Sequence, residues 1–517
     1  MCIILLFWSN MFTFNSHIKL AAINFKTHTT MRNRTRFNVQ KAILIGLIIQ
    51  LTFLLDSFGQ TKAEKIDELM RLYNEYGQFN GSVLVAENGK VIFKKGFGMA
   101  NMEWEVPNQP DTKHRLGSVT KQFTAMLILQ LVEEGKLNLN VPITTYLPDY
   151  PKETGDIITI HHLLTHTSGI PNFTSFPNYQ KDISINKFNP DAIIKIFADS
   201  SLQFKPGEKF SYSNSGYLVL GAIIEKVTGK SYEQIIHENI LNPLKMNNTG
   251  YDHHETILKN RASGYENKYR NADYIDMSVP YSAGALYSTV EDLYLWDQAL
   301  YNETLLSSNT RDLLFKPYIK TMGESYGYGW CVGKKPIGNT GDSVKVISHS
   351  GGINGFNTSI QRIPSDKNLI VLLNNTGGAA LSEINTAIIS ILYGTSYEMP
   401  KKSVAFSVLD VIMENGLTSG LEHFEMIKNS ENCSLKEDEL NSVGYILLNA
   451  DKVAEAIDVF KLNVEAFPKS GNVYDSLGEA YLVDGNEKLA IVNYKKSLEI
   501  DPTNSNAKNV LKKLGVN

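Results

Sequence analysis

The stretch Ser118-Val119-Thr120-Lys121 places a serine hydroxyl and a lysine amine three residues apart. If a helix starts at Ser118, positions i and i+3 lie on one face, so the amine can reach the hydroxyl. A serine becomes a good nucleophile when a neighbouring base takes its proton, and burial lowers the pKa of a lysine enough for it to act as that base. The four residues therefore predict a nucleophile, Ser118, with Lys121 beside it.

The surroundings of this S-x-x-K pair distinguish it from the others in the chain. The run from Phe123 to Leu131 is apolar nearly all round, which is typical of a buried helix that holds a nucleophile rigidly. Three further S-x-x-K pairs lie in polar, repetitive or N-terminal segments: Ser16 and Lys19, Ser184 and Lys187, and Ser505 and Lys508. The motif alone is weak, and its context selects Ser118.

Two more motifs follow in order along the chain. Tyr212-Ser213-Asn214 comes after Pro206-Gly207-Glu208 and directly before an apolar helical run, unlike two other Y-x-N matches near residue 270. His349-Ser350-Gly351-Gly352 comes after Gly327-Tyr328-Gly329-Trp330 and is the one H-x-G in the sequence. Read alone, the second motif is a plain glycine turn with an exposed histidine. Its position after the other motifs favours a functional interpretation.

The ordered triplet resembles the penicillin-binding-protein and β-lactamase superfamily of serine hydrolases, in its class C β-lactamase, D,D-peptidase and esterase branch. Further phrases that carry the resemblance are Leu163-Leu164-Thr165-His166-Thr167-Ser168-Gly169-Ile170 and Pro206-Gly207-Glu208-Lys209-Phe210, and the similarity runs from about residue 81 to about residue 392. No G-x-S-x-G occurs, which disfavours hydrolases of the nucleophile-elbow type.

The resemblance implies a role for each site residue. Ser118 would be the acylated nucleophile and Lys121 the adjacent base or charge, while Tyr212 would relay a proton to the leaving group and Asn214 would hold substrate and lysine. Which of Lys121 and Tyr212 takes the first proton stays open. The three residues that follow the histidine would contact the substrate: Ser350, Gly351 and Gly352. The N–H groups of Gly352 and Ser118 would bind the oxyanion.

His349 stands where many relatives carry a lysine. Because a histidine loses its charge near pH ~6.5, we expect carboxylate-bearing substrates to bind less well above neutrality than neutral esters do. The same departure fits D,D-peptidase-like or esterase members better than an efficient β-lactamase.

The sequence at both ends of the region from about residue 81 to about residue 392 predicts strands, and the sequence in its middle predicts helices. Two short apolar runs flank Asn88-Gly89, a strong hairpin signal, and the runs 357–363 and 368–373 repeat the pattern. Helical stretches lie between, at 217–227 and 290–301. We therefore expect an α+β fold of the β-lactamase/transpeptidase type, in which one antiparallel sheet is completed by both ends of the region and a helical subdomain is inserted.

The N-terminal residues predict export. Within residues 1–59, Arg32 to Lys41 form a basic region, Ala42 to Leu55 an apolar one, and small residues precede Gln60, as in a secretory signal peptide. The apolar run is shorter than the ~20 residues of a membrane-spanning helix. Met31 is the better start, so residues 1–30 are read as an over-extended gene start. The expected location is periplasmic or extracellular, with membrane attachment only through an uncleaved signal segment.

A change of pattern divides the rest of the chain. Residues 60–400 are the predicted hydrolase domain, 401–435 a linker or degenerate helical repeat, and 436–517 helical repeats. Pairs of residues 34 apart recur in the last region: Pro468 and Pro502, Gly444 and Gly478, Ala456 and Ala490, and Phe460 and Tyr494. This spacing resembles the tetratricopeptide repeat and predicts an all-α tail that presents a surface to a protein partner.

Composition excludes some functions and leaves two open. A net charge of −4 gives no indication of nucleic-acid binding. His162 and His166 have a metal-ligand spacing, but no Glu stands between them in an H-E-x-x-H arrangement, so neither a metal nor a cofactor is expected. The leading hypothesis is an exported serine hydrolase that forms an acyl-enzyme on a peptide, amide or ester. The alternative is a catalytically weak sensor or scaffold whose repeats recruit a protein.

Overall fold

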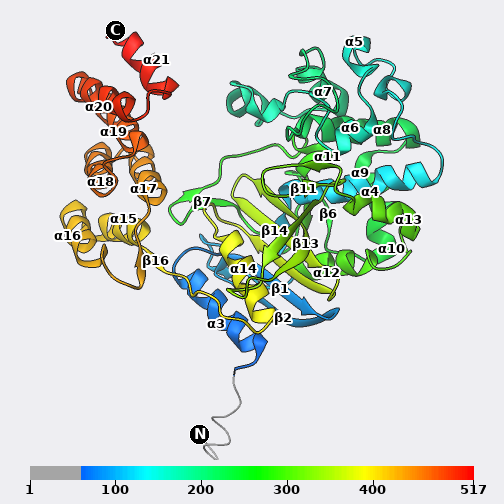
Figure 1. Ribbon diagram of the computed structural model, residues 1–517, viewed down its shortest axis with the longest axis horizontal. Helices are drawn as coiled ribbons and strands as arrows, with labels where there is room; N and C mark the ends of the chain where they lie inside the picture. Colours follow the sequence, from blue (N-terminus) through cyan, green and yellow to red (C-terminus); the bar gives the residue numbers. More distant parts are fainter. Residues whose placement is uncertain (1–59, 517) are drawn as a thin grey trace, which may run out of the picture. The chain divides into compact units, whose positions relative to one another are not determined.

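The computed structural model describes residues 60–516 (Figure 1). The signal-peptide prediction concerns residues 1–59 and lies outside the described residues. Among the described helices, none has both the length and the apolar character that crossing a membrane requires.

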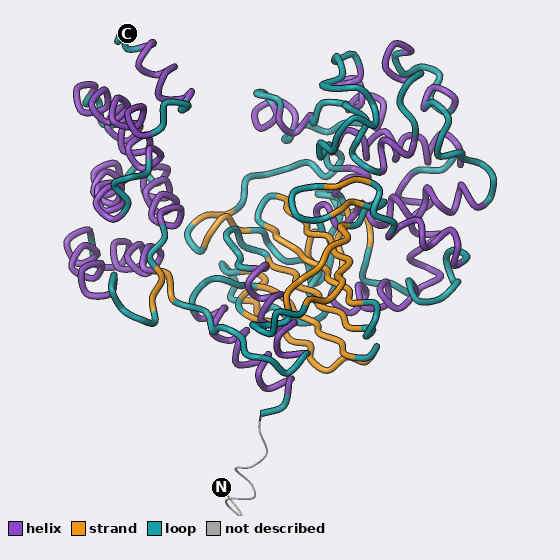
Figure 2. The backbone as a smooth tube through the Cα atoms, viewed as in Figure 1, coloured by secondary structure: helices purple, strands orange, loops and turns teal. Residues whose placement is uncertain are grey.

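An antiparallel sheet forms the centre of the catalytic region. Its strand order is β10-β11-β12-β13-β14-β15-β1-β2. In chain order the strands are β1 (Gly81–Glu87), β2 (Lys90–Phe97), β10 (Ile319–Lys320), β11 (Ser325–Tyr326), β12 (Cys331–Pro336), β13 (Ser343–Ile353), β14 (Phe356–Ile363) and β15 (Asn368–Asn374). Figure 2 shows these strands gathered together, while helices, loops and short strands make up the long segment between β2 and β10.

The two predicted hairpins meet within this sheet. Asn88 and Gly89 have φ values of 51° and 74°, the left-handed conformation that a two-residue hairpin turn between β1 and β2 requires. β1 then pairs with β15 from Gly81↔Asn374 to Ala86↔Leu369. Strands from both ends of the region therefore complete one sheet, and the predicted fold class is confirmed.

Alternating side chains of the strands bury the two faces of the sheet in different cores. Val83 and Val85 point to the core under α3 (Lys62–Glu75) and α14 (Leu381–Leu392). Leu84 and Ala86 point to the core that contains α4 (Thr120–Glu133) and α12 (Val290–Ala299). Because successive side chains point to opposite faces, β1, which is buried at nearly every position, sits between two helical layers.

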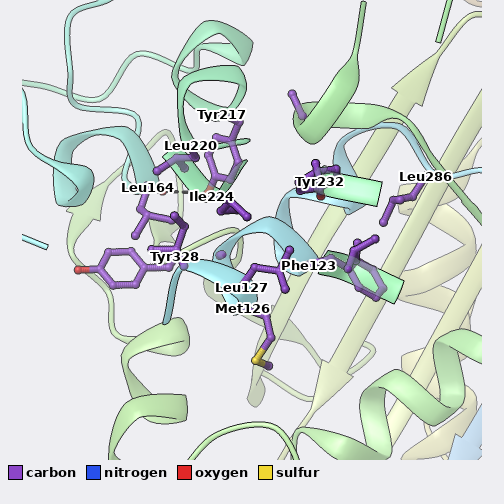
Figure 3. Packing of buried hydrophobic residues seen from close by; sticks show 14 of the residues in the cluster. Phe123, Met126, Leu127, Leu164, Tyr217, Leu220, Ile224, Tyr232, Leu286 and Tyr328 are labelled. Carbon is purple, nitrogen blue, oxygen red and sulfur yellow. Dashed lines mark hydrogen bonds between the residues drawn. The ribbon is translucent and has the colours of Figure 1, made fainter. Parts of the chain in front are cut away.

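The helix α4 lies in the larger core and is buried almost all round, as its sequence predicts. Phe123, Met126 and Leu127 pack there with Leu220 and Ile224 of α8 (Asn214–Thr228), as Figure 3 shows. The other helices between the strands are α5 (Lys152–Gly155), α6 (Ile160–Leu164), α7 (Pro190–Ala198), α9 (Tyr232–Ile236), α10 (Asn242–Leu244), α11 (Tyr281–Gly284) and α13 (Ser308–Asp312).

Short strands close the loops around this helical subdomain. A three-stranded sheet has the order β5-β9-β6, and two hairpins pair β3 with β4 and β7 with β8. Their bounds are β3 (Met99–Asn101), β4 (Val106–Pro107), β5 (His114–Arg115), β6 (Gly250–Tyr251), β7 (Tyr265–Asn267), β8 (Arg270–Asn271) and β9 (Leu286–Ser288).

The described residues after 403 are helical apart from turns and a two-residue strand. The helices are α15 (Val404–Asn415), α16 (Leu417–Ile427), α17 (Glu437–Asn449), α18 (Val453–Ala466), α19 (Gly471–Val483), α20 (Glu487–Ile500) and α21 (Ser505–Lys513), and β16 (Lys402–Ser403) pairs with β17 (Cys433–Ser434). Gly444 lies against the ring of Phe460, and Gly478 lies in the same way against Tyr494. The all-α tail is confirmed, while its tetratricopeptide assignment and the domain limits stay predictions.

Candidate active site

Ser118 lies in a tight turn and not in the helix itself. Gly117–Val119 forms a single 3₁₀ turn, and α4 begins at Thr120, two residues later than the sequence suggested. The turn starts from Gly117, whose φ of 52° is readily adopted only by glycine. Lys121 still faces the serine across this turn, and its Nζ lies 3.0 Å from Ser118 Oγ.

The Lys121 amine is fully buried among oxygen atoms. Besides Ser118 Oγ, its Nζ contacts Asn214 Oδ1 at 2.9 Å and the Ala283 carbonyl oxygen at 2.9 Å. None of the ion pairs within residues 60–516 involves Lys121. Burial without a counter-charge lowers the pKa of Lys121 well below its usual value.

The three oxygens could all accept from a charged amine, but the lowered pKa of Lys121 favours the uncharged form. A neutral lysine has two N–H donors and one lone pair. The oxygens of Asn214 and Ala283 can only accept, so they take the two donors. The lone pair is left for the Ser118 hydroxyl, whose proton then points at Lys121. The arrangement is that of a base paired with its nucleophile.

Tyr212 lies next to this pair but is a poor candidate for the first base. Its ring centroid is 4.9 Å from Lys121 Nζ. Burial raises the pKa of the Tyr212 phenol, and the neighbouring Ser118 hydroxyl offsets only part of that effect. Within the described residues the hydroxyl has no hydrogen-bond partner. A neutral phenol with a free O–H can donate a proton or a hydrogen bond to a substrate.

Asn214 is oriented by neighbours that its motif does not contain. Its backbone N–H donates to Asn172 Oδ1 at 3.0 Å, and its Nδ2 donates to Thr174 Oγ1 at 3.3 Å. These bonds turn the amide oxygen toward Lys121. The Y-x-N motif is therefore split between the end of a loop, which carries Tyr212, and the first residue of α8, which carries Asn214.

The H-x-G motif lies on an open strand edge beside the turn that carries Ser118. β12 pairs with β13 only as far as Cys331↔Ser348, so within the described residues 349–353 have no strand on that side. A Cβ placed on Gly117 would lie 2.9 Å from the Gly352 nitrogen. The predicted oxyanion donors, Ser118 and Gly352, are thus on backbone segments in direct contact.

Gly351 permits this contact, and we expect its replacement by alanine to be costly. A Cβ at Gly351 would lie 1.9 Å from the Leu116 carbonyl oxygen and 2.4 Å from Thr358 Oγ1, and the Leu116 oxygen belongs to backbone that cannot swing away. We expect Gly351→Ala to lose about 3 kcal/mol in denaturant unfolding. Gly352→Ala is the matched control for stability, because its Cβ meets its nearest neighbour at 3.9 Å. Equal losses in both variants would contradict the packing argument.

The histidine of the motif is not the titrating cation that the sequence suggested. His349 Nδ1 lies 2.6 Å from the Ser350 carbonyl oxygen, and Nε2 lies 2.9 Å from the Tyr326 hydroxyl. Burial lowers the pKa of His349 to about 4. The ring is therefore neutral throughout the range from pH 5.5 to 8.5. The lowered pKa of His349 speaks against the expected pH-dependent loss of carboxylate substrates, and burial of this kind is not visible in the sequence.

Several contributors to the site were missed from the sequence. Residues 281–284 form α11, and Ala283 supplies a backbone oxygen to Lys121. His166 and Tyr326 lie close by, although neither belongs to the three motifs. His162 instead accepts a hydrogen bond from the Thr159 N–H at the start of α6. Within the described residues no group of three His, Cys, Asp or Glu side chains could hold a metal.

Comparisons with known proteins agree with this geometry. The Beta-lactamase family model matches residues 63–392. The putative penicillin-binding protein PbpX of Bacillus subtilis is 34% identical over 319 residues, which are 61% of this chain and 75% of that protein. The octameric penicillin-binding protein homologue from Pyrococcus abyssi superposes with a TM-score of 0.58 at 32% identity, covering 67% of this chain and 81% of that one. The D-amino acid amidase of Ochrobactrum anthropi SV3 gives 0.55 at 25% identity over 63% and 96%.

Proposed function

Because the chain belongs to the beta-lactamase family of serine hydrolases, we propose that it forms an acyl-enzyme on an ester, amide or short peptide through Ser118. The observation that carries this proposal is the position of the Lys121 amine, which has two obligate acceptors and the Ser118 hydroxyl around it. A buried neutral amine in that position can take the serine proton directly.

The proposed reaction passes one proton around the site. Lys121 takes the proton of Ser118 as Oγ bonds to the substrate carbonyl carbon, and the N–H groups of Ser118 and Gly352 bind the oxyanion. The bond to the leaving group then breaks. Tyr212 gives its phenolic proton to the leaving oxygen or nitrogen and regains one from the Lys121 ammonium. Water attacks the acyl-enzyme by the same steps in reverse and releases the acid.

The open edge of β13 supports an extended substrate. An acyl chain lying along residues 349–353 can exchange main-chain hydrogen bonds with the strand, as an added strand would. The names of similar proteins, a penicillin-binding protein and a D-amino acid amidase, fit peptide, amide and ester substrates, including D,D-peptidase-like and esterase-like ones. We propose export to the periplasm or the outside of the cell, where such peptides occur.

The helical tail supports a second, compatible role. The same glycine-on-aromatic contact recurs at Gly444 and Gly478, 34 residues apart, as stacked repeats would produce. We propose that the tail binds a protein partner. A sensor without catalysis is the weaker hypothesis, because Ser118, Lys121, Tyr212 and Asn214 are all present and assembled.

Intact-mass measurement after exposure to a penicillin tests the proposed nucleophile. We expect wild type to gain the mass of one opened lactam and Ser118→Ala to gain none, and a nitrophenyl ester to be hydrolysed by wild type alone. An adduct of equal amount on both proteins would assign the acylation to another residue. The absence of both the adduct and ester turnover in wild type would contradict the proposed function.

A further inference from the structure

Three buried side chains behind the site form a continuous hydrogen-bonded chain. The backbone N–H of Ser213 donates to His166 Nδ1 at 3.2 Å, and His166 Nε2 lies 3.3 Å from the Tyr326 hydroxyl. Tyr326 in turn lies 2.9 Å from His349 Nε2, whose other nitrogen lies 2.6 Å from the Ser350 carbonyl oxygen. The chain runs from the Y-x-N motif to the H-x-G motif.

The two backbone ends fix the direction of every proton in this chain. His166 Nδ1 accepts from an N–H, so the proton of a neutral His166 is on Nε2, and that N–H donates to the Tyr326 oxygen. His349 Nδ1 faces a carbonyl, so it must carry the proton of that ring. The remaining nitrogen, His349 Nε2, then accepts the proton of the Tyr326 hydroxyl. Each member donates once and accepts once.

A charged His349 does not fit this order. With a proton on both nitrogens it would need an acceptor at Nε2, where the Tyr326 oxygen already accepts from His166. The hydroxyl proton of Tyr326 would then have to turn away from His349 toward the hydroxyl of Tyr217, the other phenol beside it. The charged or titratable groups around His349 are Lys121, Tyr212, Tyr326 and His166, from four separate segments, and none is an anion at neutral pH.

His166 holds its place at a conformational cost. It follows α6 with φ at 56°, an uncommon value for a histidine, and its carbonyl accepts from the Ser211 N–H at 2.9 Å. Its ring lies 4.2 Å from the ring of Tyr212 at an angle of 32°. Residues held in such backbone conformations cluster at functional sites.

We propose that His166 and Tyr326 are positioning residues that fix His349 as a neutral ring with both nitrogens turned away from substrate. The substrate group beside His349 is then uncharged, so the site selects acyl substrates without a carboxylate at that position. This deepens the proposed function and rests on it for the substrate class. The proton order of the chain, however, stands without any turnover.

Nitrogen NMR of the full chain with ¹⁵N-labelled histidine tests the proton order directly. We expect His349 to be neutral with its proton on Nδ1, and His166 to be neutral with its proton on Nε2, from pH 8 down to 5. Signals are assigned by their loss in His349→Gln and His166→Asn, since asparagine tolerates the left-handed backbone at position 166. A wild-type His349 that titrates near pH 6.5, or carries its proton on Nε2, overturns the proposal whether or not the enzyme is active.

Kinetics then test the consequence for substrate choice. The probes are the 4-nitrophenyl esters of 4-carboxybenzoic acid and 4-carbamoylbenzoic acid, whose acyl groups differ in charge at equal size. In wild type we expect the neutral ester to be preferred in kcat/KM by a ratio that stays constant from pH 5.5 to 8.5. Tyr326→Phe removes the group that holds Nε2, so the His349 ring can turn toward the substrate, where a carboxylate offsets the cost of a buried imidazolium, and the charged ester should gain about tenfold toward pH 5.5.

The control for this variant is Tyr328→Phe. Tyr328 is as buried as Tyr326, and its hydroxyl contacts a histidine that is not in the chain, His161, at 2.7 Å from Nδ1. We expect Tyr328→Phe to keep the flat ratio. A flat ratio in Tyr326→Phe, or the same slope in both variants, overturns the positioning role. If wild type showed no Ser118-dependent turnover at all, the proposed function would be overturned instead. The proton order measured by NMR does not depend on turnover.

Discussion

Lys121→Met is expected to slow acylation about 10³-fold while leaving the protein folded. Methionine fills much the same volume but cannot take the Ser118 proton. The buried amine has no counter-charge among its contacts, so replacing it with an apolar side chain removes a desolvation cost. The oxygens of Asn214 and Ala283 lose a donor, which offsets part of that gain. Stopped-flow acylation by a nitrophenyl ester measures the effect.

The matched control for this variant is Lys113→Met. Lys113 is also buried, but its Nζ donates to the Lys259 carbonyl oxygen at 3.1 Å, away from Ser118. We expect wild-type acylation and a similar thermal midpoint in that control. In wild type the acylation rate should rise with pH and level off above the pKa of Lys121, because the neutral amine is the active form. Acylation by Lys121→Met within tenfold of wild type, with a large loss in Tyr212→Phe, would make Tyr212 the first base.

The sequence predicts the fold well where local pattern decides it. Asn88-Gly89 between apolar runs predicts the β1–β2 hairpin because that turn needs two residues with positive φ. The α4 sequence predicts a buried helix because it is apolar on nearly every face. The start of this helix was predicted less accurately. A 3₁₀ turn at Gly117–Val119 precedes Thr120, and the S-x-x-K motif fits both a helix that starts at Ser118 and a 3₁₀ turn followed by a helix.

Contacts between distant segments explain what the sequence could not predict in the site. Ala283 acts through a backbone oxygen, which every residue type possesses, so its identity gives no signal. The charge of His349 depends on Tyr326, a residue 23 positions away on another strand, and on burial by the whole core. His166 lay within a phrase that carried the family resemblance, but its role depends on where Tyr212 packs.

The protein is expected to lose much of its stability between pH 6.5 and pH 4. Burial lowers the pKa of His114 to about 4, and that of His349 to about 4 as well. In the unfolded chain a histidine binds its proton below about 6.5, whereas the folded protein keeps both rings neutral until about pH 4. Acidification therefore favours the unfolded state, by about 3 kcal/mol for each ring over this range. Two such rings amount to much of the stability of an ordinary domain.

His114→Phe should remove the part of this pH dependence that comes from His114, without touching the catalytic side chains. The His114 ring donates from Nδ1 to the Thr112 carbonyl oxygen at 3.0 Å, and its Nε2 has no hydrogen-bond partner within the described residues. The variant lacks that one hydrogen bond at neutral pH. In acid it gains, because it has no ring at position 114 that takes up a proton on unfolding. We expect urea unfolding to show the variant gaining about 2.5 kcal/mol on wild type between pH 7 and pH 4.5. His237→Phe, at an exposed position, is the control, and an equal gain there would contradict the assignment to buried His114.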